Sequence, residues 1–360
     1  MVYSAEGEVT NGAGAVNIYA ATGAGKLAPA AARARPLVYV PNSRSASVTV
    51  IDPATYRVVR TFATGAVPQH VVPAYDLTRL WVLNNQASTL TPIDPLTSEE
   101  GRPVHVDDPY NMYYTPDGRF AVVIAERRMR LDFRDSKTLK PIASVRTACR
   151  GIDHIDFTAD GRYMIASCEF NGHLLKLDLA SRKPVGYLAL DTAGRDTASM
   201  PQDVRSSADG RTIYVADMKL DGVHLIDPIA FVRVGFVHTG KGTHGLYPSR
   251  DGRLLYVTNR GWNTLKAGRH GPGSISVLNF STRRVVANWV VPGGGSPDMG
   301  NVTADGRELW VSGRYDEEVY VFDTRSGTLT HRIPVGREPH GLCVWPQPGR
   351  FSLGHTGNMR

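Results

Sequence analysis

The sequence predicts an all-β protein, a β-propeller with seven blades. Short apolar runs alternate with Asp-Gly turns in copies such as YTPDGRFAVVIAE, FTADGRYMIASCE, SSADGRTIYVADM and PSRDGRLLYVTNR. A second series of strands ends seven times at an acidic or amide residue, namely Asp52, Asp94, Asp135, Asp178, Asp227, Asn279 and Asp323. Seven copies of about 40 residues, each with about four short strands, are typical of four-stranded blades around a central channel.

The first strand of each blade is predicted to line the channel. The residues that open these inner strands are Val71, Met112, Ile155, Val204, Leu246, Gly300 and Leu342. Their spacings are 41, 43, 49, 42, 54 and 42 residues, and the two longest contain insertions at 191–201 and 261–273. Insertions in repeat folds form loops, often on the binding face. We expect the segment 261–273 to cover the site as a lid.

The two ends of the chain are predicted to share the closing blade. Residues 342–356 contain only inner strands, and residues 37–64 supply outer strands without an inner partner. Pairing them closes the ring and leaves no exposed inner sheet edge. We therefore divide the chain into an N-terminal arm, 1–30, and the propeller, 31–360.

Composition excludes several classes of protein. The chain has 42% hydrophobic and 21% charged residues, and no apolar run approaches the roughly 20 residues of a membrane span. The net charge of +7 comes from scattered Lys and Arg, which argues against a nucleic-acid partner and allows an anionic small-molecule ligand. The first residues lack the features of a signal peptide, so we expect a cytoplasmic monomer, with an exported form that has lost its leader as the alternative.

The three cysteines show no paired metal-binding spacing. Cys149 and Cys168 belong to the same repeat and would be neighbours across strands. Two buried thiols are the favoured interpretation, and a disulfide is the alternative.

Candidate functional residues occupy the two positions before each inner strand, which converge on one mouth of the channel. The nearer position holds His70, Asn111, His154, Asp203, Gly245, Met299 and Gly341 in turn, and the farther holds Gln69, Tyr110, Asp153, Gln202, His244, Asp298 and His340. The Asp residues that end strands are interpreted as turn formers, because they repeat. The mouth residues vary, as an asymmetric site shared by the blades requires.

Four histidines in this set predict a metal site formed by His70, His154, His244 and His340. Neutral imidazoles around an axial cavity suit copper, zinc or iron. The favoured function is a metal-dependent enzyme, an oxidoreductase, lyase or hydrolase, that acts on a small organic molecule with His154, Asp203 and Asp298 as catalytic groups. The alternative is a non-catalytic propeller that binds a ligand or a protein.

The ends of the second strands form an outer ring around the same mouth. From the two rings we expect ligand contacts by Tyr110, Asn111, Gln202, Glu169, Arg260 and Arg314, with the two arginines holding an anionic group. The sequence has no GxSxG elbow and no phosphate-binding loop after a strand, so Ser-His-Asp catalysis and nucleotide binding are not predicted.

The repeats LVYVPNSRSASVTVIDPATYRVVRTFATG and GRTIYVADM resemble the YVTN-type repeats of the YncE-like β-propellers, which are related to the haem-binding propeller of nitrite reductases. The resemblance covers 37–360 and implies the seven-bladed fold. In the nitrite-reductase relatives, histidines at the channel mouth contact a tetrapyrrole, which implies a similar place for the four histidines here. The chain has no CxxCH motif, so covalent haem is excluded, and a non-covalent tetrapyrrole is less favoured than a metal ion.

Overall fold

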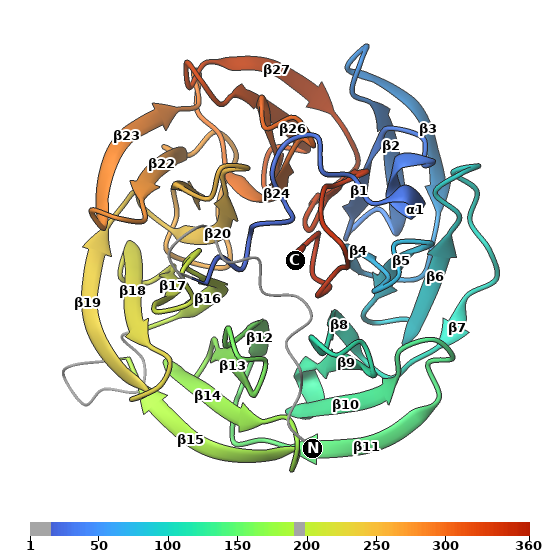
Figure 1. Cartoon of the computed structure of the whole chain (residues 1–360). Coiled ribbons are helices and arrows are strands. Elements are labelled where there is room, and N and C mark those ends of the chain that lie inside the picture. Colours follow the sequence, from blue (N-terminus) through green and yellow to red (C-terminus); the bar gives the residue numbers. More distant parts are fainter. Residues whose placement is uncertain (1–15, 191–198) are drawn as a thin grey trace.

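Seven four-stranded antiparallel sheets form a closed ring in the computed structural model, which describes residues 16–190 and 199–360 (Figure 1). The predicted fold class is therefore confirmed. The inner strands lie next to the central channel and the fourth strands lie at the rim. None of the described helices is long and apolar enough to cross a membrane.

From the inner to the outer strand, six sheets follow the order of the chain. The first three are β4 (Pro68–Pro73), β5 (Leu80–Asn84), β6 (Thr89–Ile93) and β7 (Val104–His105); β8 (Pro109–Tyr114), β9 (Phe120–Ala125), β10 (Arg130–Asp135) and β11 (Pro141–Arg146); β12 (Ile152–Phe157), β13 (Tyr163–Cys168), β14 (His173–Asp178) and β15 (Lys183–Ala189). The next three are β16 (Pro201–Ser206), β17 (Ile213–Asp217), β18 (Gly222–Asp227) and β19 (Val232–His238); β20 (Thr243–Pro248), β21 (Leu254–Asn259), β22 (Ser274–Asn279) and β23 (Arg284–Val290); β24 (Pro297–Val302), β25 (Glu308–Gly313), β26 (Glu318–Asp323) and β27 (Leu329–Pro334). The helical segments are α1 (Pro29–Ala32) and the 3-10 turn η1 (Glu126–Arg128).

Strand burial follows the sequence pattern. Inner strands such as β4 and β12 are buried at every position, because neighbouring sheets cover both of their faces. The rim strand β15 alternates between exposed and half-buried residues, as a strand with one solvated face does. The Asp residues that end strands form turns as expected, and Asp52 Oδ1 accepts a hydrogen bond of 2.8 Å from Ala54 N–H.

The closing blade combines both ends of the chain in the order β28 (Cys343–Trp345), β1 (Leu37–Asn42), β2 (Ser47–Asp52) and β3 (Arg57–Ala63). Its sharing by the two ends is confirmed, but the expectation that 342–356 supplies several inner strands is wrong. Only β28 comes from the C-terminal part. The two prolines and lost turn Asp of WPQPGR explain the difference, because proline removes a ladder hydrogen bond.

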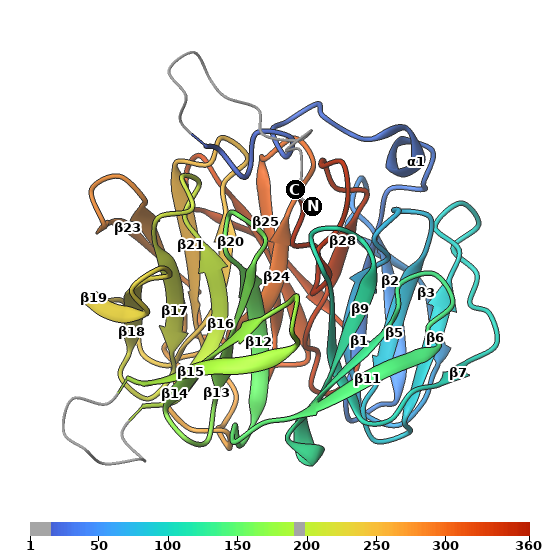
Figure 2. The same cartoon turned by 60° about the horizontal axis from the view of Figure 1, so that its bottom comes forward.

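Residues 346–360 turn into the channel instead and fill one end of it. Gly354 forms a β-bridge with Tyr113 on β8, and His355 N–H donates to the Met112 carbonyl oxygen at 2.9 Å. At the end of the chain, Arg360 forms an ion pair of 2.9 Å with Asp156. Figure 2 shows α1 and the C-terminus at the same end of the ring. We call residues 346–360 the channel plug.

A disulfide joins Cys149 and Cys168 across the start of β12 and the end of β13. The favoured interpretation of two free thiols is therefore wrong. The sequence could not decide this, because only the antiparallel pairing of the two strands brings the Cα atoms to 4.9 Å. Cys343 on β28 is a buried free thiol.

Candidate metal centre and channel mouth

Six of the seven candidate pairs lie inside the inner strands and not before them, which corrects the sequence-based placement, whereas His340 and Gly341 precede β28 as predicted. In β12, β16, β20 and β24, two residues face a single residue of the second strand, and β4 and β8 carry a similar register shift. Such a bulge re-aims side chains and is frequent beside functional sites. It lets neighbouring residues such as Asp153 and His154 both lie near the axis.

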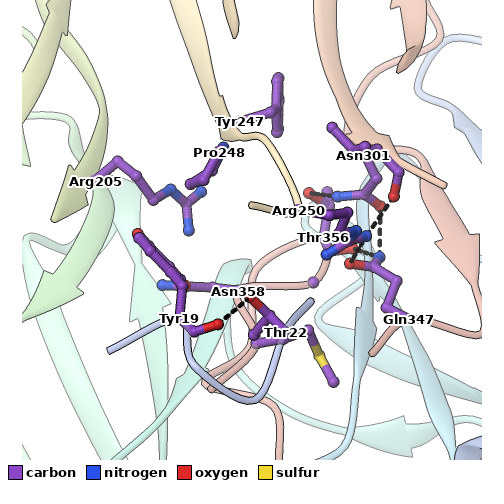
Figure 3. Close-up of a pocket in the computed structure, with 13 residues that line it drawn as sticks. Tyr19, Thr22, Arg205, Tyr247, Pro248, Arg250, Asn301, Gln347, Thr356 and Asn358 are labelled. Carbon is purple, nitrogen blue, oxygen red and sulfur yellow. Dashed lines mark hydrogen bonds between the residues drawn. The ribbon is translucent and has the colours of Figure 1, made fainter. Parts of the chain in front are cut away.

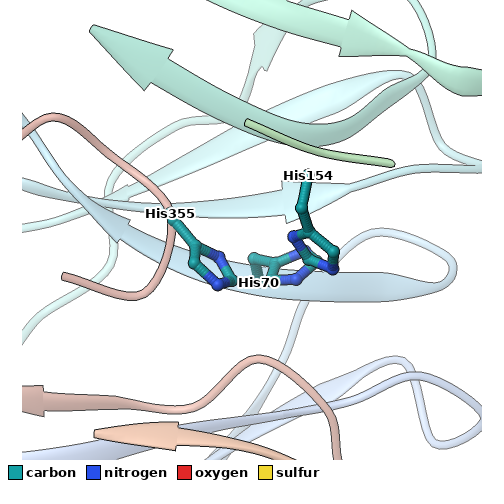
Figure 4. A group of neighbouring side chains, drawn as sticks. All are labelled: His70, His154 and His355. Carbon is teal, nitrogen blue, oxygen red and sulfur yellow. The ribbon is translucent and has the colours of Figure 1, made fainter. Parts of the chain in front are cut away.

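Three imidazoles meet inside the channel, on His70 of β4, His154 of β12 and His355 of the plug (Figure 4). Each residue is fully buried, and one ligand atom from each lies within 4.8 Å of the other two. Ring centroids are 5.6 Å apart for His70 and His154 and 4.8 Å apart for His154 and His355. We call these three residues the histidine cluster.

The Nε2 atoms of the histidine cluster have no hydrogen-bond partner. The nearest carboxylate oxygens lie 3.3 Å from His154 Nε2, on Asp153, and 3.7 Å from His355 Nε2, on Asp203. Unpartnered buried polar atoms are rare in proteins and often mark an ion or water that completes them.

Hydrogen bonds at Nδ1 orient the three rings. His70 Nδ1 lies 3.0 Å from the carbonyl oxygen of Tyr110. The Asn111 side-chain nitrogen lies 3.3 Å from His154 Nδ1 and 3.1 Å from His355 Nδ1. Asn111 Oδ1 in turn accepts from Met112 N–H at 2.9 Å, so this amide links two rings of the cluster.

Burial keeps the rings of the cluster neutral. It lowers the pKa of His70, His154 and His355 well below the usual value, and the neighbouring His355 and Arg205 add to the effect for His154 and His355 respectively. Neutral imidazole is the form that binds a metal ion.

Sequence reasoning missed His355, because the plug lies outside the repeats. The available signal was the departure of WPQPGRFSLGHTG from the repeat pattern, with two prolines and a His between glycines.

Asp298 of β24 gathers the other two predicted histidines and both predicted arginines. His340 Nδ1 donates to Asp298 Oδ2 at 2.6 Å, and Arg260 Nε donates to Asp298 Oδ1 at 2.6 Å. His244 Nδ1 and Arg314 Nη1 lie 3.0 and 3.6 Å from its oxygens. Burial opposes ionisation of Asp298, but Arg260, His244 and His340 together hold its pKa well below the usual range.

His244 and His340 differ from the histidine cluster in their hydrogen bonds, although the ring centroids of His340 and His70 are only 4.8 Å apart. His244 Nε2 accepts from Arg260 Nη2 at 2.5 Å, and its Nδ1 lies 3.0 Å from Asp298 Oδ1. His340 keeps Nε2 free of strong partners, with the Tyr110 hydroxyl 3.5 Å away. Burial and Arg314 lower the pKa of His340 to about 4.

A glycine fixes the place of His70. A Cβ on Gly341 would lie 2.1 Å from His70 Cδ2, so only glycine fits beside this ring. Gly341, which occupies the nearer of the two candidate positions in its repeat, is therefore required by the packing of His70.

Three acidic side chains, Glu126, Asp153 and Glu169, form the opposite side of the mouth. Burial and the charge of Glu169 raise the pKa of Glu126 to about 7. Burial first and then Glu169 raise the pKa of Asp153 well above its usual value, and burial raises that of Glu169. Gln202 Nε2 donates to Glu169 Oε1 at 3.0 Å, which places this predicted ligand residue within the acidic group.

Asp203 connects two blades and does not face the mouth. Its oxygens accept hydrogen bonds of 2.9 Å from the backbone N–H groups of Val204 and Leu246, and Arg205 Nη2 lies 3.4 Å away. Asp156 makes the equivalent bond to Ser206 N–H at 2.8 Å. These two aspartates therefore tie β12 to β16 and β16 to β20.

The insertion 261–273 lies beside the mouth and contacts the next blade. Tyr315 OH donates to the Leu265 carbonyl at 3.0 Å, and His270 N–H donates to Asp316 Oδ1 at 2.6 Å. The other insertion, 191–201, falls largely on 191–198, which lie outside the described residues.

Comparison with protein families identifies the fold family. A family model described as YNCE-like beta-propeller matches residues 9–348. The chain belongs to the YNCE-like β-propeller family. A search of curated protein sequences gave no match for this family member.

Solved structures similar to this YNCE-like propeller share its fold at low sequence identity. Hydrazine synthase of Kuenenia stuttgartiensis is 19% identical with a TM-score of 0.65, over 81% of this chain and 93% of that one. The dihydro-heme d1 dehydrogenase NirN in complex with DHE is 14% identical with a TM-score of 0.62, over 86% and 75%. A protein of unknown function from Desulfotomaculum acetoxidans is 14% identical with a TM-score of 0.68, over 87% and 100%. These likenesses concern the fold alone.

Proposed function

We propose that this YNCE-like propeller is an enzyme that holds one transition metal ion on its histidine cluster and acts on a small anionic molecule at the adjacent mouth. The observation that carries the proposal is the meeting of three buried imidazoles, within 4.8 Å of one another, whose Nε2 atoms have no hydrogen-bond partner. Imidazole ligands suit copper, zinc or iron. The proposal keeps His70 and His154 of the sequence-based metal set and replaces His244 and His340, which are bound to Asp298, by His355.

The fit of the rings to a metal ion depends on Asn111. A ligand that binds through Nε2 carries its ring proton on Nδ1, and a nearby acceptor then fixes that tautomer. His70 already faces an acceptor, the carbonyl of Tyr110. Asn111 faces both other Nδ1 atoms with its nitrogen, so we propose that its amide turns to present oxygen to them when metal binds.

The ligand's anionic group is assigned to Arg314. Arg260 is 3% exposed and engaged by Asp298 and His244. Arg314 keeps a side-chain exposure of 19% and lies 3.6 Å from Asp298, so its guanidinium has N–H donors to offer an incoming carboxylate. Tyr110 and Gln202 are assigned as the neutral contacts to the ligand at the channel mouth.

Proton transfer is assigned to Glu126, and Asp298 is assigned a positioning role. Asp298 stays ionised and orients His340, whereas Glu126, with a pKa raised to about 7 by burial and Glu169, exchanges a proton near neutral pH. The base role expected for Asp203 is not carried forward, because its oxygens are bound by backbone N–H groups. A bound metal ion would supply Lewis-acid polarisation of a ligand oxygen.

An ion is favoured over a tetrapyrrole as the group held between the rings. Centroid separations of 4.8 to 5.6 Å within the cluster leave no room for a macrocycle between the imidazoles. The NirN structure is a complex with DHE according to its title, and its similarity to this chain concerns the fold.

Metal analysis of untagged protein tests the proposal. We expect close to one equivalent of copper, zinc or iron per chain in the native protein, and at least about tenfold weaker binding in His355→Gln. His105→Gln is the matched control, because His105 has 74% side-chain exposure and lies outside the channel. Equal metal content in His355→Gln and native protein, or no binding on titration with all three metals, would favour the non-catalytic ligand-binding alternative.

Asn111 variants separate a metal site from a polar core. Asn111→Asp supplies acceptors for both Nδ1–H groups, so we expect it to bind metal more tightly than Asn111→Leu, which removes the hydrogen bonds and should lose about 10- to 100-fold in affinity. If the three rings form only a polar core, both variants change unfolding temperature without any difference in metal binding.

The compartment is proposed from the disulfide. Disulfides persist in oxidising compartments and are rare in the reducing cytoplasm. The Cys149–Cys168 bond therefore supports action outside the cytoplasm, the alternative given above to a cytoplasmic monomer.

A further inference from the structure

A second polar pocket, of about 30 Å³, lies at the plugged end of the channel (Figure 3). Its walls come from β16, β20 and β24, from the channel plug, and from the N-terminal segment that contains Tyr19 and Thr22. The side chains used below are Arg205, Arg250, Gln347 and Asn358. The described residues that line the pocket include two arginines and no Asp or Glu.

Arg250 has no anionic partner among the described residues. Its Nε donates to the Thr303 carbonyl at 2.9 Å, and its Nη2 donates to the Val302 carbonyl and, at 3.5 Å, to Gln347 Oε1. All of these acceptors are neutral. Burial lowers the pKa of Arg250 to about 10, and the negative charge of Asp305 offsets this lowering only in part. The guanidinium is thus held near the pocket by dipoles alone.

Arg205 presents a second guanidinium to the same space. The residue is 3% exposed, its Nε donates to the Leu246 carbonyl at 3.2 Å, and its Nη2 lies 3.4 Å from Asp203 Oδ2. No bond to a described residue engages Nη1. Figure 3 shows the end of this side chain directed into the space above Asn358 and Tyr19.

Of the three arginines Arg205, Arg250 and Arg360, one lacks a carboxylate partner among the described residues. Arg205 is paired with Asp203, and Arg360 with Asp156 at 2.9 Å. Arg250 remains unpaired. A buried or half-buried charge is stabilised when it has a counter-ion that its hydrogen bonds can reach.

We infer that this pocket binds one compact, weakly hydrated monovalent anion, namely chloride, bromide or nitrate, between Arg205 and Arg250. Guanidinium N–H groups give strong, charge-assisted bonds to anions. A volume of about 30 Å³ exceeds the roughly 10 to 15 Å³ that one water needs, so the pocket has room for a small ion. One monovalent anion also balances the one unpaired cation.

The anion would join three parts of the chain. Arg205 and Arg250 belong to the ring, Asn358 to the channel plug, and Tyr19 to the N-terminal segment that crosses it. Binding would therefore hold the plug in the channel. This site is distinct from the proposed metal centre and does not depend on it.

Bromide soaking of native crystals provides the direct test, because bromide is located by its anomalous scattering. We expect one bromide within hydrogen-bond distance of the Arg205 and Arg250 guanidinium groups. In solution at constant ionic strength, we expect chloride, bromide and nitrate to raise the unfolding temperature relative to fluoride. Spherical bromide and planar nitrate, tested separately, identify which shape the pocket prefers.

Arg250→Gln should weaken bromide binding at least about tenfold, since it removes the unpaired charge. Arg253→Gln is the control, because Arg253 has 80% side-chain exposure and comes from the same turn. If Arg250→Gln does not fold, the bromide position in native crystals still decides. An empty pocket in bromide crystals, equal stability in all sodium salts, or preferential binding of phosphate would overturn the inference.

Discussion

The carboxyl groups on the two sides of the channel mouth are chemically alike, but their pKa values are shifted in opposite directions. Asp298 has a guanidinium at 2.6 Å and two imidazoles at 2.6 and 3.0 Å, and its pKa is held well below the usual range despite burial. Burial and mutual repulsion instead raise the pKa of Glu126 and Asp153 on the acidic side. Burial alone favours the neutral acid, and a buried cation reverses that preference. The blades share one fold, so the ionisation of their carboxyl groups is set by the neighbouring charged side chains.

Acidification is expected to give the largest effect, because it acts on all five channel histidines. Their pKa values lie below the unfolded value of about 6.5, chiefly through burial. The unfolded chain takes up these protons first, so the stabilisation is complete above about pH 6.5 and is lost as pH falls. For His340, with a folded pKa of about 4, the loss is about 3 kcal/mol.

Urea unfolding of metal-free protein across this range measures that loss. The acidic side works in the opposite direction, since Glu126 contributes stability that disappears as pH rises through its folded pKa of about 7. We expect the greatest stability between these limits. A free energy of unfolding that stays constant from about pH 7 to pH 5 would contradict the neutral state of the histidines.

Asp298→Asn should remove the difference in carboxyl ionisation between the Asp298 side and the acidic side of the mouth. The variant leaves the Arg260 guanidinium buried without a counter-ion, so we expect a loss of about 3 to 5 kcal/mol in the free energy of unfolding. Asp305→Asn is the control, because that carboxylate has 56% side-chain exposure and pairs with an exposed arginine. A loss below about 1 kcal/mol for Asp298→Asn would show that Arg260 finds another partner.

The double variant Cys149→Ser with Cys168→Ser should loosen the acidic side selectively. The disulfide closes a loop with a sequence separation of 19 that contains Asp153, and Glu169 follows Cys168 directly. A loop of this size corresponds to a loss of about 3 kcal/mol. Amide hydrogen exchange should rise in β12 and β13 and stay unchanged in β24. Equal changes in both regions would mean that the two sides are not independent.

Glu126→Gln should give the smallest effect and a gain. Gln cannot ionise, so the variant avoids the cost that the native carboxyl meets above its folded pKa of about 7. We expect a gain of up to about 1 kcal/mol at about pH 8 and little change at about pH 4, measured by urea unfolding. A gain that is the same at both pH values would come from packing and not from charge.

Repeats made the fold and the mouth predictable to different degrees. Strand and turn patterns are local, so seven blades and the convergence of His70, His154, His244 and His340 followed from spacing. The bulges did not follow, because they depend on how each inner strand pairs with the second. Nor did the grouping of the histidines, since Asp298 contacts His244 and His340 while the plug brings His355 to His70 and His154.

Residues with a single occurrence were the hardest to place. His355 and Arg250 belong to no repeated column, so nothing in the spacing indicated that one lies in the channel beside His154 and the other lies at its plugged end. Asp203 illustrates the opposite difficulty. Its position in the repeat correctly predicted that it lies near the channel axis, but it did not predict that backbone N–H groups donate to its oxygens.

The path of residues 343–360 also sets the order in which the molecule is completed. Ribosomes release a chain from its N-terminus, and domains fold largely in that direction. β1 is synthesised early and has no partner on its inner side until β28 is made, and His355 follows the end of β28 by ten residues. A nascent chain therefore holds at most two of the three clustered imidazoles until its ring has closed, so the proposed metal site is complete only in the finished molecule.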